Sequence, residues 1–105
     1  MQPVKNKLVY LPPAREDLID IGRYHLERVG PNSARRITDS IETAVLRLAN
    51  YPLLGQAHPD PLLAQQGYRK LVARSPYVCI YKVIDSTVYV YRIADGRTDY
   101  PRLLP

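Results

Sequence analysis

The chain is poor in the residues that build metal centres and disulfides. Its 105 residues include one cysteine and two histidines. An internal disulfide needs a second cysteine, so none can form, and a reducing compartment, the cytoplasm, is expected. His25 and His58 lie far apart in the sequence, and we expect both at the surface or at its boundary. Neither a metal site nor a cofactor is therefore expected.

Long apolar runs and phosphate-binding glycine motifs are missing as well. The apolar stretch Leu8–Leu11 is too short for a signal-peptide core or a membrane span. Cys79 has no histidine at a suggestive spacing and is interpreted as a small buried hydrophobe. Glu16 and Asp17 are interpreted as charges at a helix start, not as a catalytic dyad. Nucleophilic and metal-dependent hydrolases are therefore disfavoured.

The positive charge is unevenly distributed along the chain. The net charge is +5. Residues 1–67 carry eight basic and seven acidic side chains, whereas residues 68–105 carry seven basic and three acidic ones. Such an excess favours an anionic partner, either nucleic acid or an acidic protein. An equally good interpretation is that the net charge of +5 only keeps the protein in solution.

The first half of the chain predicts a strand followed by two helices. Residues 7–11 form the strand, and Pro13 suits the first turn of a helix. The first helix carries its apolar residues at Ala14, Leu18, Ile21, Leu26 and Val29. Gly30-Pro31 separates it from a second helix that ends at residues 50–52. Two helices with so short a break form an antiparallel hairpin.

The second half predicts three strands, at residues 68–74, 77–84 and 87–93. Ser75-Pro76 and Asp85-Ser86 are good turn formers between them. The connection over residues 51–67 is long, which indicates function or a short helix at Leu62–Gln66. The prediction is one α+β domain over residues 1–105: a strand, a helical hairpin and a three-stranded antiparallel meander, with both helices on one face of the sheet.

Several short motifs follow one another in a fixed order along nearly the whole chain. They are Ala14–Ile21 with Tyr24, Gly30 with Ala34 and Ile37, the Leu-x-x-x-Pro-x-x-Gly of Leu48–Gly55, Tyr68-Arg69, Tyr81, Arg92-Ile93 and Gly96-Arg97-Thr98-Asp99. In this order the motifs resemble the RelE/ParE superfamily, the toxins of type II toxin–antitoxin modules. The resemblance implies a toxin that an antitoxin neutralises, with a role in plasmid stabilization.

Two branches of this superfamily imply different targets. RelE-like members cut messenger RNA on the ribosome, usually with an arginine where this chain has Val78 and often with a tyrosine later than Tyr100. ParE-like members inhibit DNA gyrase, and their second helix and Gly-Arg-x-Asp ending are more similar to this chain, although many have His where Asp95 stands. The resemblance therefore favours a ParE-like gyrase inhibitor. The alternatives are a RelE-like ribosome-dependent endoribonuclease and a non-toxic binding module or decayed relative, so enzyme activity stays open.

Basic and aromatic side chains of the sheet half are the candidates for binding the antitoxin or the target. Arginine can grip an anion in a bidentate manner, and tyrosine can stack on a base. Asp99 is expected to hold the guanidinium of Arg97 by paired hydrogen bonds. Tyr77, Tyr81, Tyr89 and Tyr91 are interpreted as packing partners along the strands. The candidate binding residues are Arg69, Lys70, Arg74, Arg92, Arg97, Asp99 and Tyr100. No catalytic residue is assigned, and no membrane partner is expected.

Overall fold

A computed structural model describes residues 5–105 of the chain. The strands are β1 (Lys7–Tyr10), β2 (Gln56–Ala57), β3 (Arg69–Arg74), β4 (Tyr77–Ile84) and β5 (Thr87–Asp95). The helices are α1 (Pro12–Arg28), α2 (Pro31–Leu46) and α3 (Pro61–Gln65), with 3-10 turns at Arg47–Ala49 and Tyr100–Leu103. The predicted strand, helical hairpin and three-strand meander are confirmed, and the short helix expected near Leu62 is α3.

The five strands form one sheet in the order β1-β5-β4-β3-β2. Strands β3, β4 and β5 pair antiparallel, as predicted. Two features were not predicted: β1 pairs with β5 in parallel, with Leu8 opposite Val88, and β2 adds a two-residue edge strand opposite Arg69 and Lys70. The sheet is therefore mixed, and β2 covers only the beginning of β3.

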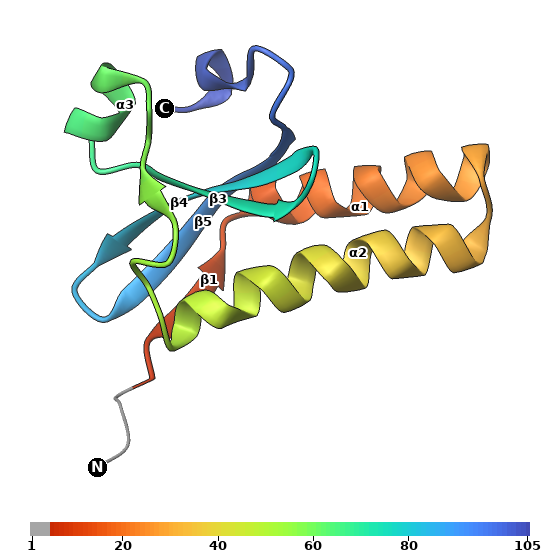
Figure 1. Ribbon diagram of the computed structural model, residues 1–105, viewed down its shortest axis with the longest axis horizontal. Coiled ribbons are helices and arrows are strands. Elements are labelled where there is room, and N and C mark those ends of the chain that lie inside the picture. Colours follow the sequence, from red (N-terminus) through yellow and green to blue (C-terminus); the bar gives the residue numbers. More distant parts are fainter. Residues whose placement is uncertain (1–4) are drawn as a thin grey trace.

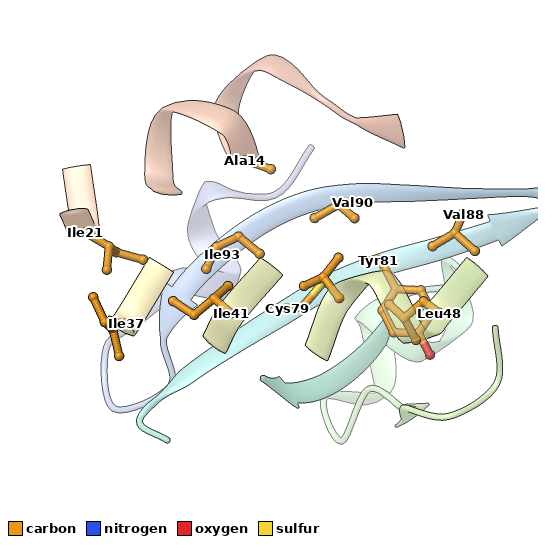
Figure 2. Packing of buried hydrophobic residues seen from close by; sticks show 11 residues of the cluster. Ala14, Ile21, Ile37, Ile41, Leu48, Cys79, Tyr81, Val88, Val90 and Ile93 are labelled. Carbon is orange, nitrogen blue, oxygen red and sulfur yellow. The ribbon is translucent and has the colours of Figure 1, made fainter. Parts of the chain in front are cut away.

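Both helices pack on one face of the sheet, as expected (Figure 1). The apolar positions Ile37, Ile41 and Val45 of α2 recur every four residues and are buried against the sheet. Strand β4 contributes Cys79 and Tyr81 to this core (Figure 2). Burial raises the pKa of the Cys79 thiol, so the cysteine is the inert buried hydrophobe that the sequence predicts.

The far half of α1 differs from the prediction. Ala14 and Ile21 are buried, but Leu26 and Val29 are exposed, Val29 to 72%. The reason is that the helical hairpin extends past the end of the sheet (Figure 1). Beyond His25, which still contacts Tyr77 at the start of β4, α1 has no strand beneath it, so the expected apolar stripe stops before Leu26.

The opposite face of the sheet carries a second, smaller core. Val78 and Ile80 alternate with the helix-facing residues of β4 and pack with Leu63 of α3 and Tyr100. The C-terminal segment and α3 thus cover part of the face that α1 and α2 leave free. This cover was not predicted, because it depends on where the long connection and the chain end fold back.

The hydroxyl of Tyr81 fixes the loop that follows α2. It donates a hydrogen bond to the carbonyl of Pro52 (2.8 Å) and accepts one from the N–H of Gly55 (3.0 Å). A Cβ at position 55 would lie 2.7 Å from the carbonyl oxygen of Lys70 and 2.8 Å from this hydroxyl. Glycine is therefore required where the loop meets the sheet, which gives a physical reason for the Pro-x-x-Gly spacing.

Replacing Tyr81 by Phe should lower the free energy of unfolding by about 1–3 kcal/mol, because the buried Gly55 N–H and Pro52 carbonyl lose their partner. Chemical denaturation measures this loss. Tyr89→Phe on β5 is the matched control and should change stability by less than about 0.5 kcal/mol. Equal effects of both substitutions would contradict the role assigned to the Tyr81 hydroxyl.

Candidate functional site

The seven candidate binding residues do not form one cluster. Arg69 begins β3, and its guanidinium donates to the carbonyl of Gly55 at 2.6 Å, so it also braces the loop after α2. Lys70, its neighbour, pairs with Ile80 and lies on the opposite face of the sheet. Arg74 ends β3 and is exposed. Of the remaining four residues, Arg92 lies within β5, and Arg97, Asp99 and Tyr100 follow that strand.

Arg92 forms a largely buried ion pair with Asp17 of α1. Its Nε and Nη2 donate to the two carboxylate oxygens at 2.7 and 2.8 Å. Asp17 also accepts the backbone N–H of Ile93 at 3.0 Å. This hydrogen bonding raises the pKa of Arg92. The interpretation of Asp17 as a helix-start charge is wrong: it lies in the second turn of α1 and anchors the helix to β5.

Arg97 is bound by a different carboxylate from the one expected. Its Nε and Nη2 donate to Asp95 at 3.0 and 2.7 Å. Asp99 instead lies 3.9 Å from Arg102, on the surface. The turn at Gly96 lets Arg97 fold back onto the strand end, so the residue two positions earlier is in reach. The guanidinium of Arg97 lowers the pKa of Asp95 to about 2, while Arg97 itself remains 76% exposed.

Tyr100 is buried and faces His58. Its hydroxyl lies 2.7 Å from Nε2 of His58, and Nδ1 of His58 accepts the backbone N–H of Asp60. A neutral imidazole has one donor and one acceptor nitrogen, so Nε2 carries the hydrogen and donates to Tyr100. The prediction that His58 lies near the surface is wrong, because it is only 5% exposed. His25 is half-buried beside the Tyr77 hydroxyl (3.1 Å), as expected.

A basic groove lies between α2 and the edge of β3. Strand β2 pairs only with Arg69 and Lys70, so the edge of β3 beyond them is open. The groove has a volume of about 520 Å³. It is lined by Arg36, Asp39, Ser40, Thr43, Ala44, Arg47, Ala73 and Arg74. A second hollow of about 270 Å³, next to His25, shares Arg36 and Arg74 and continues the groove towards the hairpin tip.

Three arginines give this groove its charge. Over residues 5–105, neither Arg36, Arg47 nor Arg74 forms an ion pair, and Asp39 is the one carboxylate in the lining. Arg36 and Arg47 are eleven positions apart, three turns of a helix, so they share a face of α2 and its 3-10 end. The spacing of Arg36 and Arg47 could be predicted from the sequence. That Arg74 lines the same groove could not, because it depends on how α2 crosses the sheet. The groove can bind an anionic, extended segment at an open strand edge.

The position that decides between the two toxin branches is occupied by a buried side chain. Val78 is 4% exposed and packs in the second core with Tyr100. Gly96 closes over it, since a Cβ there would lie 3.2 Å from Val78 Cγ1. The predicted packing roles of Tyr77, Tyr81 and Tyr91 are confirmed, because each contacts one of the two cores.

Two further kinds of site were sought in the part of the chain that the structure describes. None of its helices has the length and apolar character needed to cross a membrane. Residues 5–105 also contain no group of three or more His, Cys, Asp or Glu side chains that could hold a metal ion.

The structure defines a small α+β protein with an open basic groove beside a strand edge. The family model for the ParE toxin of the type II toxin–antitoxin system, parDE, matches residues 8–100. This match covers most of the chain, so the chain belongs to the ParE toxin family, and the predicted membership of the RelE/ParE superfamily is confirmed. Comparison with curated protein sequences finds no match.

Two solved structures are similar in fold. The chromosomal ParDE toxin–antitoxin system from P. aeruginosa matches with a TM-score of 0.74 and 21% identity, over 87% of this chain and 96% of that chain. The RelBE2 toxin–antitoxin complex from Mycobacterium tuberculosis matches with a TM-score of 0.57 and 23% identity, over 88% of this chain and 99% of that chain. The predicted α+β architecture is thus shared with both branches of the superfamily.

Replacing Asp17 by Asn should lower the free energy of unfolding by about 2–3 kcal/mol, because it leaves Arg92 without its counter-charge in a largely buried place. Thermal and chemical denaturation measure the loss. Asp20→Asn is the matched control, since its pair with Arg23 is exposed and 3.4 Å long, and should cost less than about 0.5 kcal/mol. An Asp17→Asn protein as stable as Asp20→Asn would show that the Arg92 pair does not anchor α1.

The stability of the fold should fall as the pH drops below the ordinary pKa of histidine. Burial, followed by the nearby Lys70, lowers the pKa of His58 from its usual 6.5. The unfolded chain therefore binds a proton at a higher pH than the folded chain, and stability is lost as pH falls below about 6.5. Unfolding measured at pH 7.5 and pH 5 tests this. His58→Gln should abolish much of the difference and His25→Gln should keep it; the reverse pattern would contradict the assignment.

Proposed function

We propose that this protein is a toxin that inhibits DNA gyrase and is neutralised by a cognate antitoxin. The observation that carries the choice of target is the burial of Val78. A ribonuclease of the RelE-like branch would present a basic residue there, whereas this chain places an apolar side chain beneath Gly96 and Tyr100. A buried valine can neither bind a phosphate nor transfer a proton. Family membership and this position together favour the gyrase-directed branch.

The groove between α2 and β3 supports the antitoxin partner. An open strand edge offers backbone N–H and C=O groups that an extended peptide can pair with. Arg36, Arg47 and Arg74 surround that edge with unpaired positive charge. An antitoxin segment that carries Asp or Glu side chains would match both features. We therefore place the antitoxin's docking segment in this groove.

Arg97 remains a proposed contact for the target. Its guanidinium is largely exposed and is held in place by Asp95. It can therefore bind an anionic group without a change in its conformation. Asp99 and Tyr100 do not support this role, because the first is paired with Arg102 and the second is buried.

Expression of the chain alone should slow bacterial growth, and co-expression of its antitoxin should restore growth. The purified protein should inhibit DNA supercoiling by purified gyrase and leave translated messenger RNA intact. Cleavage of message during translation, with gyrase unaffected, would assign the protein to the ribonuclease branch. Normal growth at high expression of folded protein would instead indicate a decayed relative.

Replacing Arg74 by Ala should weaken antitoxin binding by about 1–3 kcal/mol, and more at low salt than at high salt. Calorimetric titration measures this. Arg23→Ala is the matched control, because Arg23 is an exposed arginine of α1 that does not line the groove. Circular dichroism verifies that both variants fold. An unchanged affinity for Arg74→Ala would remove the groove from the antitoxin interface.

A further inference from the structure

The hollow that continues the basic groove towards the hairpin tip is small and lined by hydrogen-bond donors. Its volume is about 270 Å³, below the range of about 300–1,000 Å³ that is typical of sites for drug-sized molecules. Its lining consists of His25, Ser33, Arg36, Ile37 and Arg74. Apart from Ile37, each of these side chains can donate a hydrogen bond, and none carries a negative charge. The hollow therefore suits a small anion.

Packing of the helical hairpin on the sheet brings these side chains together. Arg74 ends β3 and pairs with Tyr77, the first residue of β4. The hydroxyl of Tyr77 lies 3.1 Å from Nε2 of His25 on α1. Ser33 and Arg36 are three positions apart in α2, so they lie on the same side of that helix. The donors thus come from both helices and from the sheet, and they surround the hollow.

The positive charges of the hollow are not neutralised by the protein. Over residues 5–105, neither Arg36 nor Arg74 forms an ion pair. Asp95 lies opposite Tyr77 on the neighbouring strand, but its carboxylate accepts hydrogen bonds from Arg97, the shortest at 2.7 Å. Two guanidinium groups are therefore free to bind an anion from solution.

His25 can act as a further donor. Burial raises the pKa of the Tyr77 phenol, so this hydroxyl keeps its proton and can donate it to Nε2 of His25. A neutral imidazole that accepts at Nε2 carries its hydrogen on Nδ1. An anion in the hollow would favour this tautomer, because Nδ1 can then donate to one of its oxygens.

We propose that this hollow binds a phosphate group, either free inorganic phosphate or the phosphoryl group of a phosphorylated side chain. One guanidinium satisfies a planar carboxylate with two parallel N–H groups. A carboxylate would therefore leave the second arginine, Ser33 and His25 without a role. A phosphate has more oxygens and carries up to two negative charges, so it can accept hydrogen bonds from both arginines and from the hydroxyl at once.

A bound phosphate would compete with the antitoxin, because the hollow and the groove share Arg36 and Arg74. This consequence rests on the proposed docking of the antitoxin in the groove. The phosphate site itself depends neither on that docking nor on the inhibition of gyrase.

The test is an NMR titration of the isotope-labelled full chain with sodium phosphate at constant ionic strength, and with sodium acetate for comparison. Phosphate should shift the amide signals of Ser33 and Arg36 to saturation, and acetate should bind at least about tenfold more weakly. Arg36→Gln and Arg74→Gln should each weaken phosphate binding about tenfold, because each removes one charged donor group. A phosphoserine peptide identifies the source: tighter binding than free phosphate indicates a phosphorylated segment, and equal or weaker binding indicates the free ion.

Arg23→Gln is the matched control, because Arg23 is an exposed arginine of α1 that does not line the hollow. It should leave the affinity for phosphate unchanged, and circular dichroism verifies that all variants fold. Equal losses in Arg23→Gln and Arg36→Gln would mean general attraction to a basic protein and would overturn the proposal, as would acetate that binds as tightly as phosphate. Phosphate that binds the chain but leaves antitoxin affinity unchanged would contradict the docking of the antitoxin and not the phosphate site.

Discussion

The carboxylate of Asp17 joins the two layers of this protein. Strand β1 accompanies β5 only as far as Val90, where the N–H of Leu11 donates to the Val90 carbonyl at 2.9 Å. The chain then turns into α1, and the edge of β5 loses its partner strand. Asp17 pairs with this free edge in place of a strand. Its carboxylate accepts hydrogen bonds from the N–H of Ile93 and from Nε and Nη2 of Arg92. One side chain thus completes the edge of the sheet and fixes the helical hairpin upon it.

A bulge in β5 makes this arrangement possible. The pairing of β4 with β5 shifts between Ile80, opposite Arg92, and Tyr81, opposite Val90, so Tyr91 is the extra residue. Val88, Val90 and Ile93 can therefore all reach the helix-facing core, while Tyr91 turns to the other face. The bulge also places Arg92 at the edge of β5, within hydrogen-bonding distance of Asp17. The bulge thus lets β5 contribute Ile93 to the core beneath the helices and Arg92 to the ion pair that anchors α1.

The sequence allowed the elements to be predicted because each depends on local signals: the four-residue spacing in α2, the turn formers at residues 75–76 and 85–86, and the β-branched and aromatic run of β4. The contacts could not be predicted in the same way. Asp17 and Arg92 are seventy-five positions apart, and nothing local marks them as partners. Arg97 forms its ion pair with Asp95 and not with Asp99 because of the turn at Gly96. The hydrogen bond between Tyr100 and His58 forms because the C-terminal segment folds back over α3.

The basic side chains of the strands are divided between the two faces of the sheet. The antitoxin groove takes its arginines from α2 and the helix side of β3, whereas Lys7, Lys70 and Lys82 project from the other side of the sheet. His58, the histidine near Lys70, has both ring nitrogens engaged, one with Tyr100 and one with the Asp60 N–H. The imidazole of His58 therefore serves to hold the C-terminal segment and the loop before α3 together.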